Sequence, residues 1–352
     1  MKIAIFDPYL DTLGGGERYV ATIAEYLSKN HEVHLLWDDQ AIKNKLMDRL
    51  NLDLSNIQIV PNIFSGETFL KRSITLKTYD RFLYLSDGSL PYQLAKKNFL
   101  HFQFPINWIK NLSLNNRIKL SNYQEIICNS YFTKKFIDKT YKVYSKVVYP
   151  PIDTNKFLPQ EKDKLIISVG RFTKILHDKK QELLIDAFKK LYDSGVSDWR
   201  LIIAGGMGES EKNLLEELQN MAKGYPIKLL VNITFKELRE LYGKASIYWH
   251  AAGLGEDVEN HPEKTEHFGI AIVEAMSAGC VPFTVNNGGP SEIIEEDVSG
   301  LFFNSIDDLV TKTKILTRNQ EKLKKISQNA IARSKKFSKE RFCQEIRKVM
   351  EI

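Results

Sequence analysis

The sequence of 352 residues is poor in cysteine, with only Cys128, Cys280 and Cys343. Three widely separated cysteines are too few for a disulfide framework and lack the spacing of a metal site. They are typical of a protein from a reducing compartment. We therefore expect each of them to be a small core residue rather than a nucleophile.

Long hydrophobic runs are also missing. The longest candidate, Gly269 to Val285, is interrupted by Glu274, so we expect no transmembrane helix of about 18 apolar residues. The apolar stretch from Met1 to Asp7 is too short for a signal peptide and predicts a buried strand. These absences favour a cytoplasmic location, with the cytoplasmic face of a membrane as the alternative.

Several binding motifs are absent as well. The seven histidines show no HExxH or paired spacing, so we expect no metal site. The turn Gly14-Gly15-Gly16 lacks the GxGxxG pattern of dinucleotide folds, although its backbone amides can still admit an anionic ligand. The basic residues form no stripe with aromatic residues, which argues against a nucleic-acid partner. The net charge of +6 fits an anionic substrate, an acidic membrane surface or a general basic background.

The residues that are present predict an α/β protein with two domains, because short apolar strands alternate with helical patterns in both halves. The pair Pro150-Pro151 breaks this alternation and marks the boundary. A highly charged helical region, Ile306 to Met350, ends the chain. The expected strands are Lys2–Phe6, His31–Trp37, Arg81–Ser86, Glu125–Asn129, Lys164–Val169, Arg200–Ala204, Lys228–Val231, Ser246–Ala251 and Val281–Val285.

The segment from Glu266 to Glu274 follows a predicted strand and opens a helix over Ile270–Ala278. Gly269 allows close backbone approach, and the free N–H groups from Gly269 to Ala271 predict an anion site at the helix start. The two carboxylates could hold hydroxyl groups at both ends of a sugar–diphosphate–nucleoside. Taken alone, the spacing fits two surface glutamates beside a buried helix equally well.

Cations follow the first strand of the second half. Arg171 comes directly after Val169-Gly170, and Lys179 precedes the next helix. A guanidinium and an ammonium at one strand end suit a diphosphate leaving group, although two solvated surface cations have the same pattern. We expect Lys180 to be a solvated surface cation.

Two histidines lie near predicted strand ends. His101 stands in Leu100-His101-Phe102, and His250 follows Trp249. A lone histidine in such a place is usually structural, and it gains a functional role only if it faces a ligand site.

Together these motifs resemble the retaining family 4 glycosyltransferases, which have the GT-B fold of two facing Rossmann-like domains with parallel sheets. The resemblance covers almost the whole chain through Gly14-Gly15-Gly16-Glu17-Arg18, Val169-Gly170-Arg171, Asp178-Lys179, Glu266–Pro282 and Gly288–Glu292. It implies an acceptor domain over 1–150 and a nucleotide-sugar domain over 151–335. It also implies that the helix over 336–352 crosses back to pack on the first domain.

The resemblance also implies roles for individual residues. Glu266 binds sugar hydroxyls and supports charge at the reacting carbon, Glu274 binds the ribose, and Arg171 and Lys179 hold the diphosphate. His101 lies near the transferred sugar. The backbone of Phe268, Gly269, Ile270 and Ala271 completes the phosphate and sugar site, and Gly15 and Gly16 border the phosphate or the acceptor.

The expected activity is retaining transfer of a hexose-type sugar from a GDP- or UDP-sugar to a hydroxyl of a glycan or lipid-linked acceptor. No metal or other cofactor is required, because Arg171 and Lys179 replace a metal electrostatically. The alternatives are a sugar-nucleotide epimerase of the same fold and a non-catalytic protein that binds sugar nucleotides.

Two further features remain open at the level of sequence. Peripheral membrane association is an expectation that depends on Phe69-Leu70-Lys71-Arg72 and Leu94-Ala95-Lys96-Lys97, each of which mixes apolar and basic residues. A long polar loop, Gly253 to Lys264, precedes Glu266 and could shape the sugar pocket or act as a lid.

Overall fold

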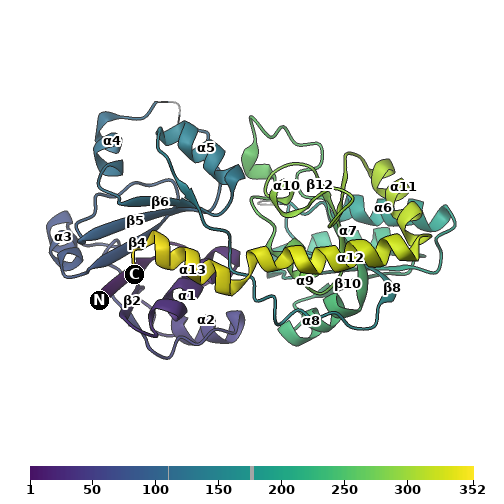
Figure 1. Cartoon of the computed structure of the whole chain (residues 1–352), viewed down its shortest axis with the longest axis horizontal. Coiled ribbons are helices and arrows are strands. Elements are labelled where there is room, and N and C mark those ends of the chain that lie inside the picture. The colour runs from purple at the N-terminus through teal and green to yellow at the C-terminus, as the bar shows by residue number, and fades with distance from the viewer. Residues whose placement is uncertain (110, 175–177) are drawn as a thin grey trace. The chain divides into compact units, whose positions relative to one another are not determined.

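The computed structural model describes residues 1–109, 111–174 and 178–352, which form two compact units (Figure 1). The first unit contains Met1–Pro151 together with Lys339–Ile352 from the end of the chain. The second unit contains Ile152–Ser338.

The first unit is built on a parallel sheet in the order β3-β2-β1-β4-β5-β6-β7. Helices cover both faces of this sheet, as expected where strands read as continuous apolar runs. The strands are β1 (Lys2–Phe6), β2 (Glu32–Leu36), β3 (Ile57–Val60), β4 (Arg81–Ser86), β5 (Lys97–Phe102), β6 (Glu125–Cys128) and β7 (Lys146–Val147). The helices are α1 (Gly15–Leu27), α2 (Ile42–Leu50), α3 (Phe69–Lys77), α4 (Leu114–Leu120) and α5 (Tyr131–Tyr141).

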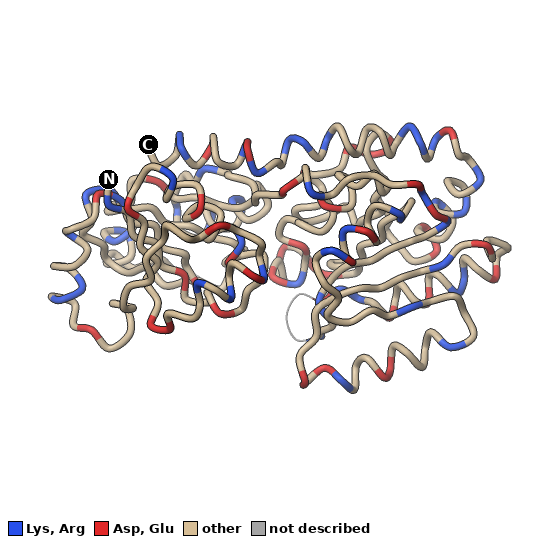
Figure 2. Tube along the Cα trace, turned by 90° about the horizontal axis from the view of Figure 1, so that it is seen from below, with Lys and Arg blue, Asp and Glu red and all other residues tan. Residues whose placement is uncertain are grey.

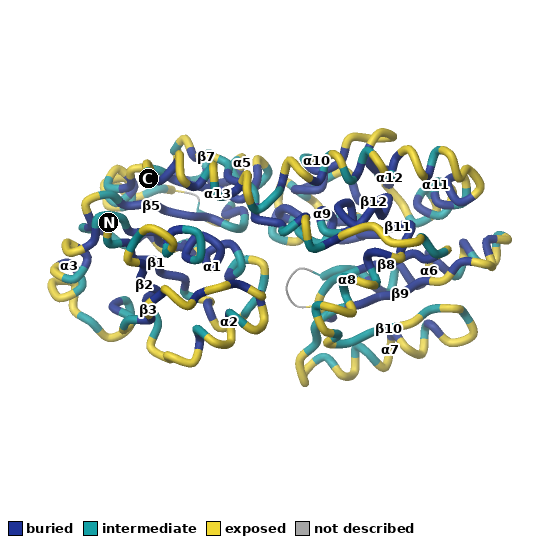
Figure 3. The backbone as a smooth tube through the Cα atoms, turned by 60° about the horizontal axis from the view of Figure 1, so that its bottom comes forward, coloured by how far each residue is buried: buried dark blue, intermediate teal, exposed yellow. Residues whose placement is uncertain are grey.

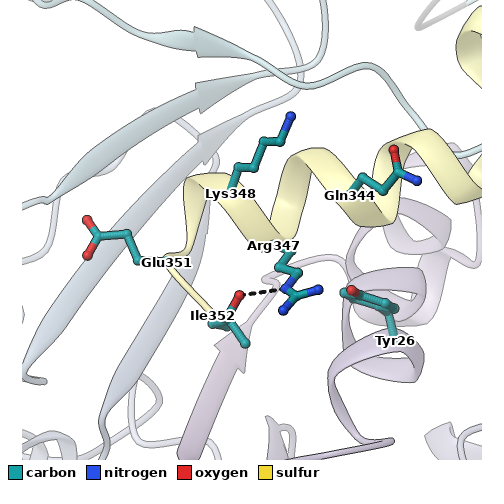
Figure 4. Close-up of a pocket in the computed structure, with 6 residues that line it drawn as sticks. All are labelled: Tyr26, Gln344, Arg347, Lys348, Glu351 and Ile352. Carbon is teal, nitrogen blue, oxygen red and sulfur yellow. Dashed lines mark hydrogen bonds between the residues drawn. The ribbon is translucent and has the colours of Figure 1, made fainter.

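The final helix, α13 (Lys339–Val349), packs on α1 in the core of the first unit. The ring of Phe342 meets the edge of Tyr19 at 4.8 Å between centroids, and Ile346 is completely buried. Figure 4 shows Tyr26 of α1 beside Arg347, whose Nε donates to the carbonyl of Ile352 at 2.9 Å. The sequence-based expectation that the last helix packs on the first domain is therefore confirmed.

The second unit has a six-stranded parallel sheet in the order β10-β9-β8-β11-β12-β13. Its strands are β8 (Asp163–Val169), β9 (Arg200–Gly205), β10 (Ile227–Val231), β11 (Ala245–His250), β12 (Val281–Val285) and β13 (Leu301–Phe303). Its helices are α6 (Gln181–Asp193), α7 (Lys212–Ala222), α8 (Phe235–Lys244), α9 (Ile270–Ser277), α10 (Pro290–Ile293), α11 (Ile306–Thr317) and α12 (Gln320–Ser334). Their apolar sides bury a core around Phe188, Trp249 and Phe283.

The predicted class, α/β with parallel Rossmann-like sheets, is confirmed in both units. The charged region from Ile306 to Met350 is not one helix, because it divides into α11, α12 and α13 at Asn319 and Ser338. No helix within the described residues is long and apolar enough to cross a membrane.

Candidate functional site

The second unit holds a partly buried ion pair at the end of its central strands. The Nζ atom of Lys179 lies 2.6 Å from Oε2 of Glu266. Nε2 of His250 lies 3.1 Å from the same oxygen. Among the residues that the structure describes, both partners of this carboxylate contact Oε2, so Oε1 is left to accept a hydrogen bond from a ligand.

Two opposing effects set the charge of this cluster. Burial alone would raise the pKa of Glu266, but the charge of Lys179 and the contact with His250 hold that pKa well below its ordinary value. Burial lowers the pKa of His250, although the neighbouring Glu266 carboxylate opposes that shift. At neutral pH the cluster therefore contains a carboxylate, an ammonium and a neutral imidazole.

Close backbone packing fixes the position of Glu266. The N–H of Gly289 donates to the carbonyl of Glu266 at 2.8 Å. A Cβ atom added at Gly288 would lie 2.3 Å from the carbonyl oxygen of Glu266, and one at Gly289 would lie 2.2 Å from Cα of Phe268. Only glycine fits at these two places, which explains the Gly288-Gly289 pair after β12.

Helix α9 begins at Ile270, four residues after Glu266, and Gly269 forms its N-cap with a left-handed φ of 112°. Within the described residues the N–H groups of Ile270 and Ala271 have no backbone acceptor, because the first helical bonds come from Ile272 and Val273. Phe268 is buried and meets Phe337 at 5.6 Å between ring centroids. The backbone from Gly269 to Ala271 therefore forms an open helix start at the place where the sequence predicts an anion site.

Arg171 and Lys179 both lie beyond β8, one before and one after the undescribed residues 175–177. The stem of Lys179 crosses Gly170, where an added Cβ would lie 2.6 Å from its Cγ. Gln181 donates to the carbonyl of Arg171 at 2.9 Å and holds the turn. Arg171 itself is exposed, and no described residue binds its guanidinium. The turn after β8 therefore carries one paired cation, Lys179, and one, Arg171, that is available to an anion.

Glu274 lies in the second turn of α9, where its Oε2 accepts a hydrogen bond from Tyr242 at 3.3 Å. The same hydroxyl also lies 3.3 Å from the carbonyl of Ala271. Burial and the charge of Glu274 raise the pKa of Tyr242 well above its ordinary value, so the phenol stays protonated and can donate. Glu266, before α9, and Glu274, within α9, therefore have different partners.

Sequence reasoning did not find the partners of Glu266 on β11. His250 was expected to be structural, yet it contacts the carboxylate directly. Nδ1 of His250 lies 3.4 Å from the hydroxyl of Tyr248, which in turn donates to the carbonyl of Val169 at 3.3 Å. The signal available in the sequence is the position of Tyr248 and His250, two residues apart and hence on the same face of a strand.

The prediction that Lys180 is a solvated surface cation is wrong. Its ammonium donates to the carbonyl of Leu254 and to Oε1 of Glu256, each at 2.6 Å, and only 14% of its side chain is exposed. Asn287 holds the same loop by donating to the carbonyl of Gly253 at 2.9 Å. The loop before Glu266 is therefore anchored at its start by the N-terminal end of α6.

The candidates from the first unit lie on β5 and α1. His101 on β5 is fully buried, stacks on Tyr19 at 4.1 Å and lies 3.2 Å from the carbonyl of Ile127. Burial lowers the pKa of His101 to about 3, so the imidazole is neutral. Gly15 is exposed at the start of α1, whereas Gly16 packs against Gln103, which donates to its carbonyl at 3.1 Å. Gln103 is the polar residue that follows β5 at the edge of the sheet where the strands end.

Carboxylates surround the start of α1. Oε2 of Glu17 accepts from the N–H of Gly14 at 2.6 Å, and both residues Asp7 and Glu17 are buried. Burial, reinforced by the charge of Glu17, raises the pKa of Asp7 to about 8. Its Oδ1 accepts from the N–H of Tyr9, whereas its buried Oδ2 has no partner among the described residues. Nowhere in the described chain, this region included, do three His, Cys, Asp or Glu side chains gather as metal ligands.

Comparison with known sequences identifies a family. The profile described as "Glycosyl transferases group 1" matches residues 151–333, just over half of the chain. A GDP-Man:Man(3)GlcNAc(2)-PP-Dol alpha-1,2-mannosyltransferase of Xenopus laevis is 31% identical over 62% of this chain and 46% of that protein. An alpha-1,3/1,6-mannosyltransferase of Candida glabrata is 26% identical over 92% of this chain and 87% of that protein. The chain spans about half the length of the first of these relatives.

Solved structures share the fold. HepE of Anabaena, in complex with UDP and glucose, superposes with a TM-score of 0.73 at 19% identity, over 100% of this chain and 99% of that one. A glycosyltransferase of Rickettsia africae gives a TM-score of 0.76 at 16% identity, over 99% and 97% of the two chains. The expected GT-B fold is thereby confirmed.

Proposed function

Because the chain belongs to the glycosyl transferases group 1 family, we propose that it transfers mannose from GDP-mannose to a hydroxyl of a glycan or lipid-linked acceptor. The observation that carries this proposal is the partly buried Lys179–Glu266 pair beside the start of α9. The printed names of mannosyltransferase relatives support the choice of GDP-mannose over a UDP-sugar.

The cations and the helix start would receive the diphosphate. Arg171 has a guanidinium free of described partners, and Ile270 and Ala271 present free N–H groups. Negative charge grows on the leaving diphosphate as the sugar bond breaks, so cations and dipoles fixed in place stabilise the transition state more than the ground state. Lys179 supplies the second positive charge from within the cluster, and no metal ion or other cofactor enters this proposal.

Glu266 would bind the transferred sugar without forming a bond to it. A carboxylate that is ion-paired with Lys179 and contacted by His250 is a weak nucleophile, which disfavours a covalent intermediate. We propose instead that the acceptor oxygen attacks the anomeric carbon on the face from which the diphosphate leaves. The new C–O bond replaces the C–O bond to phosphate, the acceptor proton passes to the departing diphosphate, and the anomeric configuration is retained.

The nucleoside and the acceptor have separate places in this proposal. Glu274, oriented by Tyr242, would bind the ribose hydroxyls. Gly15 and Gly16 would border the acceptor in the first unit. The carboxylate of Glu17 makes that region unfavourable for a diphosphate, which supports an acceptor hydroxyl there rather than a phosphate.

Thermal unfolding with a panel of sugar nucleotides tests the donor assignment. A ligand present at 100 times its Kd stabilises the folded state by about 2.7 kcal/mol, so GDP-mannose should raise Tm clearly and UDP-glucose should not. Product analysis with and without an added glycan acceptor then separates transfer from epimerisation and from binding alone. A larger shift with UDP-glucose, or sugar conversion without an acceptor, would contradict the proposal.

A further inference from the structure

Exposed apolar side chains are distributed unequally between the two units. Ten of the thirteen exposed large hydrophobic side chains among the described residues belong to the first unit. Five of these lie on just two of its helices, α3 and α4, as listed here with their exposed fractions: Phe69 54%, Leu70 68%, Ile74 60%, Leu114 74% and Ile118 54%. Such a concentration of exposed apolar groups is typical of a binding surface.

Helices α3 and α4 cover the same face of the sheet. Leu76 of α3 and Leu120 of α4 point into one core cluster with β4 and β5. Their outer sides must therefore lie on the same side of the unit. On α3, Leu70 and Ile74 are four residues apart and form an apolar stripe, and Figure 3 shows exposed positions along this helix. Leu114 and Ile118 repeat this spacing on α4. We call these four residues with Phe69 the α3–α4 face.

The charges around this face have one sign. Neither helix contains an acidic residue, whereas Lys71, Arg72 and Lys77 lie on α3 and Arg117 and Lys119 on α4. The sequence has no Asp or Glu between Asp87 and Glu125. Figure 2 shows basic and acidic residues interspersed over most of the chain, so a region with basic residues alone is unusual in this molecule. Glu67, just before α3, is the neighbouring acid and pairs with Lys71 at 2.5 Å.

The second sequence patch, Leu94 to Lys97, does not extend this face. Ala95 is buried, Lys96 pairs with Asp80 at 2.7 Å, and Lys97 pairs with Glu351. The cations of that patch are thus neutralised, and its apolar residues do not form an exposed stripe. Only the first patch, Phe69 to Arg72, belongs to the α3–α4 face.

We propose that the α3–α4 face docks the enzyme on an anionic lipid bilayer. Exposed leucine, isoleucine and phenylalanine side chains insert at the level of the headgroups, and the surrounding lysines and arginines bind lipid phosphates. Helices that connect parallel strands start at the edge where the preceding strand ends, so Phe69 and Leu114 lie toward the edge that carries Asp7 and Gly15. That edge would receive a lipid-linked acceptor, so the biological role of the docking surface rests on the proposed function. The vesicle-binding test does not depend on that function.

Co-sedimentation of the full chain with vesicles tests the docking surface. Phosphatidylcholine vesicles are compared with equimolar phosphatidylcholine–phosphatidylglycerol vesicles, at salt concentrations where the screening length is about 10 Å and about 3 Å. We expect binding to the anionic vesicles at low salt and weak binding in the other conditions. The double substitution Leu70→Ser/Ile74→Ser should lower the partition coefficient at least about tenfold. Arg117→Gln/Lys119→Gln should lower it by about tenfold and reduce its salt dependence.

Matched controls come from the second unit. Leu158→Ser/Ile315→Ser removes two apolar side chains of similar exposure, 59% and 60%, and Lys324→Gln/Lys325→Gln removes two exposed lysines. Both control variants should partition like the unaltered chain. The proposal is overturned if the unaltered chain does not bind anionic vesicles at low salt, or if the controls lose as much binding as the α3–α4 variants.

Two further measurements separate this proposal from its rivals. If sedimentation velocity shows a dimer that Leu70→Ser/Ile74→Ser converts to a monomer, the face is a self-association surface and the lipid proposal fails. The thermal shift with GDP-mannose should be the same in every variant, because all the substitutions avoid the donor cluster. Vesicle binding without a donor shift in the unaltered chain would contradict the proposed function and leave the docking surface intact.

Discussion

The two units have nearly the same sheet topology but opposite charge at the edge where their central strands end. In the first unit this edge follows β1 and carries Asp7 and Glu17, with Asp7 held largely protonated by burial and by the charge of Glu17. In the second unit it follows β8 and carries Arg171 and Lys179, with Glu266 held ionised. Arg18, the cation closest in sequence to Glu17, reaches away to the carbonyl of Leu50.

The two units therefore share a fold but differ in the ligands that this edge can bind. The same βα turn can favour or disfavour an anion, depending on whether its first helical turn is filled by a carboxylate or left open beside a cation. In α1 the side chain of Glu17 already occupies the N-terminal amide of Gly14, whereas α9 leaves Ile270 and Ala271 open. We therefore assign the diphosphate to the second unit and an uncharged hydroxyl to the first.

Removal of the cation at the second edge should have the largest effect on activity. Lys179→Ala removes the charge that would stabilise the leaving diphosphate and frees Glu266 from its ion pair. We expect kcat with GDP-mannose and an acceptor to fall about a thousandfold, which corresponds to about 4 kcal/mol. Steady-state kinetics give the effect, and thermal unfolding confirms that the variant is folded.

Lys174 provides the control for this prediction, because it is exposed and contacts only Glu217 at 3.4 Å among the described residues. Lys174→Ala should leave kcat within about twofold of the unaltered enzyme. If kcat fell equally in the two variants, Lys179 would have no specific role in stabilising the diphosphate. The proposed difference in charge between the two edges would then lose its support.

The buried carboxyl at the first edge should affect stability instead. Its pKa rises from 3.8 to about 8 on folding, so between these values the unfolded chain releases the proton and the folded chain keeps it. Stability therefore falls as pH rises through this window. Asp7→Asn keeps the acceptor for the N–H of Tyr9 and removes this penalty. We expect a gain on the order of 2–4 kcal/mol at pH 8 and little gain at pH 4, measured by denaturant unfolding.

The exposed Asp11 provides the matched control for that experiment. Asp11→Asn should change the free energy of unfolding by less than about 0.5 kcal/mol at either pH. If Asp7→Asn is equally stabilising at pH 4 and pH 8, the carboxyl does not titrate between these values and the electrostatic contrast is wrong.

The sequence predicted the strands and helices better than the side-chain contacts between residues that are distant in sequence. The strands around Lys2–Phe6 and Val281–Val285 are long apolar runs, and the structure has both with the predicted bounds. Ile57–Val60 and Leu301–Phe303 span four and three residues, too few for a periodic pattern to stand out. The expected strands also omit Lys97–Phe102, although it has six residues, so the length of a run alone does not decide whether a strand is recognised.

The positions of Lys180 and His250 depend on contacts that no local pattern contains. Lys180 has a left-handed φ of 51°, and its side chain reaches a loop more than seventy residues away. His250 meets Glu266 only because an intervening loop of fifteen residues folds back on itself.

The contact between His250 and Glu266 allows a finer test of the second edge. His250→Ala should lower kcat by about thirtyfold with little change in the KM for the donor, because the carboxylate would lose its orientation but keep the charge of Lys179. His250→Gln should recover part of the loss, since its amide can donate to the same oxygen. Because burial lowers the pKa of His250, kcat should show no titration of this group above about pH 6.5.

His261, exposed on the loop before Glu266, provides the control for this substitution. His261→Ala should leave both kcat and KM nearly unchanged. A rise in KM without a fall in kcat for His250→Ala would mean that the residue contributes to donor binding and does not position Glu266.

The smallest effect should come from the ribose end of the cluster, where two buried tyrosine hydroxyls can be compared. Tyr242→Phe removes the donor to Glu274 and should raise the KM for GDP-mannose by about threefold to fivefold at constant kcat. Tyr248→Phe removes an equally buried hydroxyl that binds the carbonyl of Val169 and lies beside His250, so it should lower kcat instead. If both variants changed the same kinetic constant, Glu266 and Glu274 would not have separate functions, and the division of the second edge into a sugar end and a ribose end would fail.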